Sequence, residues 1–169
     1  RGKDYSRRIL DAKVAKGRLD TEGRDRVLDR ILATDNISDV KGADLVVEAV
    51  FEDVELKKKV LAEVEGYVSD DALLASNTSA LPIAEMAGAV TRPSDVIGLH
   101  FFSPVDKMPL VEIVVGDQTS DESLARALDF VKQIRKTPIV VQDTYGFYAN
   151  RVIAKFVDEA LSLVAEGMH

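Results

Sequence analysis

The sequence has 169 residues, which is enough to bury the core of one domain, or of one domain and part of a second. Its net charge of −7 argues against nucleic acid as a partner, because a surface that binds a phosphate backbone carries a basic excess. The absence of cysteine excludes disulfides, thiolate metal sites and thiol nucleophiles. It also fits a cytoplasmic location, which we expect because no signal peptide and no apolar run of the ~20 residues of a membrane span is recognised.

Apolar residues at helical spacing predict two helices within residues 4–33, the second opened by Asp20 or Thr21. From residue 45 onward, short apolar runs rich in β-branched residues are typical of buried parallel strands. These runs predict strands at residues 45–50, 72–76, 96–101, 110–115 and 138–141. Helices are expected at residues 54–68, 82–87, 121–134 and 147–165. Because strands and helices alternate, we expect an α/β fold with a mainly parallel sheet.

The candidate domain boundary is the segment 142–146, because only one helix is predicted beyond it and one helix cannot form a domain. The first residue is Arg1 rather than methionine, and the last residues follow directly on a helical pattern. We therefore expect a piece of a longer polypeptide. It would consist of one partial domain at residues 1–143 and the start of a second at residues 144–169.

Polar residues follow three of the predicted strands, where ligands bind in sheets of this kind. Glu52 follows the first strand, Asn77-Thr78-Ser79 follows the second, and His100 closes the third. Each residue is a weak signal alone, but their shared edge of the sheet indicates a binding site. The alternative for residues 77–79 is that they cap the helix that starts near Pro82.

His100 and Glu112 are the candidate pair for acid–base chemistry. Glu112 interrupts an otherwise apolar strand, and a buried carboxylate is costly unless it is paired. A carboxylate beside His100 would fix its tautomer and stabilise the imidazolium, which suits a general base. The alternatives are a core histidine with satisfied hydrogen bonds and an outward-facing Glu112 on an edge strand.

Other polar residues have plainer interpretations. Glu48, within a strand, is interpreted as structural, Lys57 as a solvated helix residue, and Asn150 as a polar residue in the first turn of a helix. The sequence contains no Gly-x-Gly-x-x-Gly phosphate loop. No metal site is expected, because the only histidine besides His100 is His169. The residues alone thus predict an α/β ligand-binding domain that is a candidate enzyme.

Several strings, in this order and spacing, resemble the 3-hydroxyacyl-coenzyme A dehydrogenase family. They are Ala75-Ser76-Asn77-Thr78-Ser79, Gly98-Leu99-His100-Phe101-Phe102-Ser103-Pro104, Leu110-Val111-Glu112-Ile113, Asp143-Thr144-Tyr145-Gly146-Phe147 and Asn150-Arg151. Residues 103–108 look most like the multifunctional fatty-acid oxidation α-subunits, in which the dehydrogenase is joined to an enoyl-coenzyme A hydratase. The resemblance covers nearly the whole chain.

The resemblance implies a Rossmann-like NAD-binding domain, truncated at its N-terminus, and the first helix of an all-α C-terminal domain. It implies an oxidoreductase of fatty-acid β-oxidation that uses NAD to oxidise L-3-hydroxyacyl-CoA to 3-ketoacyl-CoA. A thiolase subunit and a homo-oligomer are the implied partners. The alternatives are a 3-hydroxybutyryl-CoA or other hydroxy-acid dehydrogenase, and a non-catalytic structural protein on the same scaffold.

The family's site residues carry over by position. His100 matches the catalytic base and Glu112 its partner, Ser79 contacts the reacting oxygen and the nicotinamide region, and Asn150 lies near the substrate carbonyl. Ser103 stands where many members have asparagine. The cofactor contacts that the resemblance implies are Val50, Phe51, Glu52, Lys57, Ser79 and Ser103.

The chain also departs from the family pattern. The family's first strand, Gly-rich loop and ribose-binding acidic residue are missing, and we expect them upstream of Arg1. Without the loop, the pyrophosphate loses its main backbone donors, so these residues alone are expected to bind NAD weakly and to be inactive. The predicted helix pair within residues 4–33 matches an insertion that helps hold coenzyme A, with Lys13 and Lys16 as candidate phosphate contacts.

Overall fold

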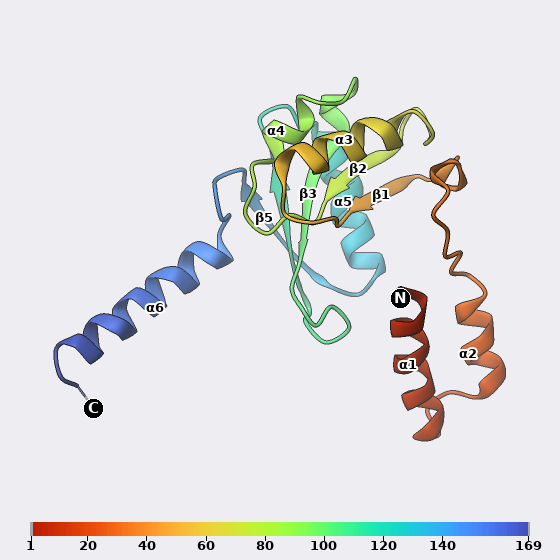
Figure 1. Cartoon of the computed structure of the whole chain (residues 1–169), viewed down its shortest axis with the longest axis horizontal. Coiled ribbons are helices and arrows are strands. Elements are labelled where there is room, and N and C mark those ends of the chain that lie inside the picture. The colour runs from red at the N-terminus through yellow and green to blue at the C-terminus, as the bar shows by residue number, and fades with distance from the viewer. Residues whose placement is uncertain (1, 169) are drawn as a thin grey trace. The chain divides into compact units, whose positions relative to one another are not determined.

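The computed structural model describes residues 2–168. The chain divides into two compact units, one that ends at Asp39 and one that starts at Val40 (Figure 1). A short 3-10 helix, Ile37–Val40, spans this boundary along the chain. Within residues 2–168, no helix is both long enough and apolar enough to cross a lipid bilayer.

The first unit is a pair of helices, as the apolar spacing predicted. Helix α1 (Gly2–Ala15) is followed by helix α2 (Thr21–Leu28). Asp20 is the N-cap of α2, since its carboxylate accepts a hydrogen bond from a first-turn N–H at 2.6 Å. Arg24 of α2 pairs with Asp11 of α1 at 3.1 Å, which ties the two helices together.

The second unit contains a five-stranded sheet of order β1-β2-β3-β4-β5 (Figure 1). The strands are β1 (Leu45–Glu48), β2 (Leu73–Ser76), β3 (Val96–Phe101), β4 (Leu110–Val115) and β5 (Thr137–Gln142). Neighbouring strands are parallel, except that β3 and β4 are antiparallel. The predicted α/β fold with a mainly parallel sheet is therefore confirmed, and the carboxyl ends of β1, β2 and β3 share one edge.

Helices cover both faces of this sheet. They are α3 (Val54–Glu65), α4 (Ile83–Ala87) and α5 (Asp121–Gln133), with a 3-10 helix at Pro93–Asp95. Side chains alternate between the faces along each strand, so the core has two layers. One layer joins Leu74, Val96 and Val114 to α3 and α4. The other joins the strands to α5 and contains Leu73, Ala75, Ile97, Leu99, Val111, Ile113, Ala127 and Val131.

The cap of α4 is not the one that residues 77–79 were expected to provide. The Asp143 carboxylate accepts hydrogen bonds from the N–H groups of Ile83 and Ala84, both at 2.8 Å. Thr78 stabilises the turn before the helix instead, because its hydroxyl accepts the N–H groups of residues 80 and 81. The capping alternative is thus wrong, and the segment after β2 remains available for other contacts.

Helix α6 (Ala149–Ala165) begins two residues later than predicted. Gly146 and Phe147 have φ angles of 76° and 50°, so both lie in the left-handed region and form a turn that precedes the helix. Phe147 is 1% exposed, and its burial in the core holds it in this conformation. From residue 151 onward the side chains of α6 are exposed, and its exposed large apolar residues are Val152, Ile153, Phe156, Val157, Leu161, Leu163 and Val164.

Candidate active site

His100 and Glu112 lie directly opposite each other on β3 and β4. The Nδ1 atom of His100 is 2.6 Å from Oε2 of Glu112, and the two residues are 6% and 0% exposed. Strand β4 lies between β3 and β5, so the alternative of an outward-facing Glu112 on an edge strand is wrong. The antiparallel register explains why two residues far apart in sequence meet at hydrogen-bond distance.

The second oxygen of Glu112 binds the start of α6. Oε1 accepts the N–H groups of Tyr148 at 3.1 Å and Ala149 at 2.8 Å. A carboxylate oxygen accepts hydrogen bonds and does not donate them. His100 therefore donates its Nδ1–H to Glu112, and Nε2 is left to accept a proton. The rings of Phe102 and Phe147 lie 4.5 and 6.0 Å from the imidazole, centroid to centroid, and restrict its orientation.

Ser79 and Asn150 are also brought together. The side-chain amide of Asn150 donates to the main-chain oxygen of Ser79 at 2.7 Å. Asn150 follows Ala149, whose N–H binds Glu112, so the first turn of α6 contacts both the His100–Glu112 pair and the loop after β2. Helix spacing alone indicated a polar residue in this turn, whereas the family resemblance implied a position near the substrate carbonyl for Asn150, which stays a prediction.

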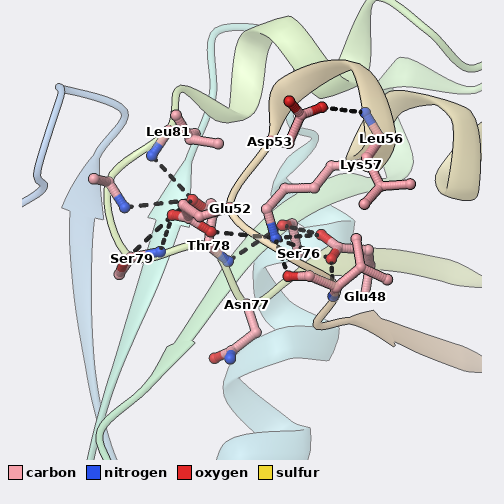
Figure 2. Close-up of polar contacts among 12 residues, drawn as sticks. Glu48, Glu52, Asp53, Leu56, Lys57, Ser76, Asn77, Thr78, Ser79 and Leu81 are labelled. Carbon is pink, nitrogen blue, oxygen red and sulfur yellow. Dashed lines mark hydrogen bonds and ion pairs between the residues drawn. The ribbon is translucent and has the colours of Figure 1, made fainter.

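Glu52 organises the carboxyl edge of the sheet (Figure 2). Its Oε1 atom accepts the Thr78 hydroxyl at 2.5 Å, the Ser79 N–H at 2.9 Å and the Ser79 hydroxyl at 3.3 Å. Burial raises the pKa of the Glu52 carboxyl, but the Thr78 hydroxyl, the Ser79 N–H and the Lys57 ammonium outweigh burial and hold the pKa below its ordinary value of 4.5. The Glu52 side chain is 40% exposed, so an ionised carboxylate faces solvent at this edge.

Lys57 is buried, and its interpretation as a solvated helix residue is wrong. Its side chain is 1% exposed, and Nζ lies 3.0 Å from Oε1 of Glu48 and 3.3 Å from Oε2 of Glu52 (Figure 2). Glu48 also accepts the Ser76 hydroxyl at 2.6 Å, in agreement with a structural role for this carboxylate. A signal for this contact was present, because Glu48 interrupts an apolar strand just as Glu112 does.

The remaining predicted cofactor contacts lie in two loops. Val50 and Phe51 follow β1 and are 37% and 87% exposed. With Ala49 and Leu56 they line an open apolar hollow of about 400 Å³. Ser103 is exposed in the loop after β3, where Lys136 holds the neighbouring carbonyl oxygens of residues 105 and 108 at 2.6 Å. Within residues 2–168, no hydrogen bond joins Ser103 to Glu52 or Ser79, so the structure does not bring it into the network.

The site thus combines an oriented, buried histidine with a polar edge at the carboxyl ends of parallel strands, which is the arrangement of a ligand-binding α/β domain. Comparison with known proteins gives the family. The model of the family "3-hydroxyacyl-CoA dehydrogenase, NAD binding domain" matches residues 1–144. The chain belongs to this family, and the resemblance inferred from its motifs is confirmed.

Its relatives are longer proteins. The fatty acid oxidation complex subunit alpha of Shewanella frigidimarina is 45% identical over 163 residues, which are 96% of this chain and 23% of the relative. The chain therefore spans about a quarter of the length of the curated relatives it matches. The homologous protein of Shewanella amazonensis is 44% identical over the same length.

Solved structures share the fold over nearly the whole chain. Mycobacterium tuberculosis FadB2 is 35% identical with a TM-score of 0.91, and the match covers 99% of this chain and 60% of that one. The 3-hydroxybutyryl-CoA dehydrogenase of Escherichia coli K12 is 34% identical with a TM-score of 0.92, and the match covers 97% of this chain and 35% of that one.

Proposed function

We propose that the protein containing this chain oxidises L-3-hydroxyacyl-CoA to 3-ketoacyl-CoA with NAD, as a step of fatty-acid β-oxidation. The observation that carries the proposal is the buried His100–Glu112 pair, whose Nδ1 and Oε2 atoms are 2.6 Å apart. Family membership supports the reaction class. The geometry supports a base, because Glu112 and the rings of Phe102 and Phe147 fix the orientation of the imidazole. The proposed site residues are His100, Glu112, Ser79 and Asn150.

The residues at the carboxyl edge fit the nicotinamide-ribose half of NAD. Glu52 presents an ionised, half-exposed carboxylate, which suits the hydroxyl groups of a ribose. Val50 and Phe51 supply apolar surface beside it. The Gly-rich loop that holds a pyrophosphate is not among these 169 residues. We therefore propose that only the nicotinamide half of NAD binds at the carboxyl edge described above. When bound, NAD supplies the acceptor for the hydride that leaves C3 of the substrate.

The proposed chemistry of the chain itself is proton transfer and orientation. Nε2 of His100 accepts the proton of the substrate hydroxyl, while Glu112 holds the ring and stabilises its developing charge. Asn150 uses one amide hydrogen on Ser79, which leaves its other N–H and its Oδ1 for the substrate. A positioned base contributes roughly 10²- to 10⁴-fold to the rate, and orientation of the substrate supplies a further part.

The domain organisation and partners remain proposals as well. We propose that residues 1–143 form part of the NAD-binding domain and that residues 144–169 start a helical domain, because the exposed apolar side chains of α6 call for a covering layer. A thiolase partner is proposed because the relatives carry names of a complex subunit. An enoyl-CoA hydratase region, a homo-oligomer and a cytoplasmic location complete the proposed picture.

A second candidate function differs in substrate length. Two structural neighbours are named 3-hydroxybutyryl-CoA dehydrogenases, at 34% and 37% identity, so a four-carbon substrate is a specific alternative. Both functions use the same base, and the residues at the site do not distinguish them.

The experiment is an NADH-formation assay on the protein encoded by the complete reading frame around this sequence. We expect turnover with L-3-hydroxyacyl-CoA and none with the D-isomer, which serves as the matched control. Comparison of four-carbon and sixteen-carbon acyl chains separates the two candidates, because turnover of the four-carbon substrate alone favours a 3-hydroxybutyryl-CoA dehydrogenase. Absence of turnover with every L-substrate contradicts the proposal.

A further inference from the structure

Asp143, the first residue after β5, is held by both its main chain and its side chain. Its N–H group donates to the main-chain oxygen of Val115 at 3.1 Å, which continues the pairing of β5 with β4. Its two carboxylate oxygens accept the N–H groups of Ile83 and Ala84, both at 2.8 Å. Asp143 therefore joins the end of the sheet to the start of α4 at the point where the chain leaves for α6.

Two further contacts continue this attachment along the chain. The N–H group of Gly146 donates to the main-chain oxygen of Ala80 at 3.1 Å. The side-chain amide of Asn150 donates to the main-chain oxygen of Ser79 at 2.7 Å. From Asp143 toward α6, the partners thus run backward along the loop after β2. The segments 143–150 and 79–84 lie side by side in antiparallel order.

The turn between Asp143 and α6 needs an anchor on each side. Phe147 has a φ angle of 50°, a left-handed conformation that a residue with a side chain adopts only when its surroundings impose it. After the turn, Glu112 binds the N–H groups of Tyr148 and Ala149. Before the turn, the anchor is the Asp143 carboxylate on α4.

The partner of Asn150 is held independently of this turn. Glu52 accepts the N–H and hydroxyl groups of Ser79 at 2.9 and 3.3 Å. Glu52 also accepts the Thr78 hydroxyl at 2.5 Å. If the turn shifts, Ser79 therefore keeps its place, and Asn150 is the residue that moves.

We propose that Asp143 is a positioning residue, which places the first turn of α6 where Asn150 reaches the substrate. The inference rests on the proposed function, because that function gives Asn150 its contact with the substrate. Without the carboxylate, two N–H groups at the start of α4 lose their acceptor and the turn loses its first anchor. Asn150 then shifts relative to His100, and the substrate is oriented less well.

The test is a double-mutant cycle on the turnover of the protein of the complete reading frame with L-3-hydroxyacyl-CoA and NAD⁺. We expect Asn150→Ala to lower turnover by about 10²-fold, as for loss of one donor to a reacting oxygen. Asp143→Ala should lower it by about ten-fold, because a misplacement of about 1 Å costs up to about 10²-fold. In the Asn150→Ala background, Asp143→Ala should change turnover by less than about two-fold.

Two results of this cycle overturn the proposal. Wild-type turnover in Asp143→Ala would show that the carboxylate serves the stability of α4 alone. The same loss of turnover in both backgrounds would show that Asp143 does not act through Asn150.

The affinity for NAD⁺ separates a shift of Asn150 from a general loosening of the site. Among residues 2–168, no hydrogen bond joins the Asp143 side chain to Glu52 or Ser79. We therefore expect Asp143→Ala to keep the dissociation constant of NAD⁺, measured by calorimetry, within about two-fold. A loss of affinity as large as the loss of turnover would mean that the whole loop after β2 has moved, and would overturn the proposal.

The matched control is the cap of another helix. Ser120 is the N-cap of α5, and its hydroxyl accepts the N–H group of Ser123 at 3.1 Å. Ser120→Ala removes a helix cap, as Asp143→Ala does, but in the described part of the chain Ser120 has no hydrogen bond to residues 79–84 or 143–150. We expect it to lower stability and leave turnover unchanged. An equal loss of turnover in both variants overturns the specific role of Asp143.

A second readout needs neither cofactor nor substrate. In the ligand-free protein, Asp143→Ala should speed amide hydrogen exchange of Tyr148 and Ala149, whose N–H groups bind Glu112. Unchanged exchange at both amides overturns the proposal. If the wild-type protein turns over no L-substrate, the proposed function fails, whereas the exchange experiment still decides whether Asp143 holds the turn.

Asp143→Asn is the second variant, for the case in which Asp143→Ala does not fold. Asparagine keeps one acceptor oxygen, but its NH₂ group cannot accept the second N–H of α4. We expect turnover below that of the wild-type protein, and no further loss when Asn150→Ala is added. Wild-type turnover in Asp143→Asn then overturns the proposal.

Discussion

Glu48 and Glu112 are buried carboxylates on apolar strands of the same sheet, one at the end of β1 and one within β4, yet they serve two different regions of the molecule. Glu48 pairs with Lys57, whose three donors are all taken by nearby acceptors. Glu112 pairs with His100, whose second ring nitrogen remains to accept a proton. The first pair holds two loops together, and in the proposed function the second pair prepares a base. A buried carboxylate in an apolar strand therefore indicates a paired polar group. The identity of its partner residue then determines whether the pair is structural or suited to proton transfer.

The largest difference between the two pairs is expected at His100. His100→Gln removes the only group of the pair that can take up the substrate proton, so turnover should fall by roughly 10²- to 10⁴-fold. The dissociation constant of NAD⁺ should stay within about two-fold, because His100 is not part of the Glu52 network. Steady-state kinetics together with calorimetry measure both quantities. Equal losses in turnover and in NAD⁺ affinity would indicate a structural role for His100 instead.

At the Glu48–Lys57 pair, a substitution should lower the free energy of unfolding. Lys57→Met leaves Glu48 buried without its counter-charge, which costs about 3–5 kcal/mol of unfolding free energy. Glu48→Gln/Lys57→Met removes both charges and should recover most of that loss. Urea unfolding followed by circular dichroism gives the free energies. Equal stability of the single and double variants contradicts the view that an unpaired carboxylate causes the loss.

A smaller effect is expected at the cap of α4. Asp143→Ala removes the acceptor of two N–H groups at 2.8 Å and should cost roughly 1–2 kcal/mol, as for other helix caps. Asp143→Asn keeps one acceptor oxygen and should lose less. Thermal unfolding midpoints should decrease from the wild-type protein to Asp143→Asn and then to Asp143→Ala. A loss as large as that of Lys57→Met would mean that this cap is as critical as the buried ion pair.

The smallest effect is a pH dependence that comes from Glu52. The folded pKa of Glu52 lies below its ordinary value of 4.5, so its contribution to stability is present above that pH and is lost as the pH falls through the folded pKa. Stability of the wild-type protein should thus decline more steeply than that of Glu52→Gln below about pH 4.5. Unfolding midpoints at several acidic pH values test this, and parallel curves contradict it.

Local sequence signals predicted the sheet well, and long-range contacts account for what they missed. Apolar runs between turn residues predicted the strands within two residues of their observed bounds, because a buried strand consists of consecutive apolar residues. The start of α6 was misplaced because burial of Phe147 in the core imposes a left-handed turn that no local pattern announces. The cap of α4 was missed because Asp143 lies sixty residues from its partner Ile83.

Within the site, the sequence pattern indicated the His100–Glu112 pair but not the Glu48–Lys57 pair. A carboxylate inside an apolar strand led from Glu112 to His100, because their spacing suited adjacent strands. The equivalent question about Glu48 leads to Lys57, which helix periodicity alone assigns to the surface. The hydrogen bonds of Glu112 to the start of α6 form only because the segment after β5 lies beside β4 in the folded chain. No local sequence pattern predicts such a long-range contact.

The central claim is that Glu112 prepares His100 as a base, and the most direct measurement is the turnover of Glu112→Gln in the protein of the complete reading frame. Glutamine keeps the size of the side chain but removes the charge that stabilises the protonated ring. We predict that turnover falls by about 10²-fold or more while NAD⁺ affinity is retained. Wild-type turnover in this variant would contradict the account, because the pair would then be structural, like Glu48 and Lys57.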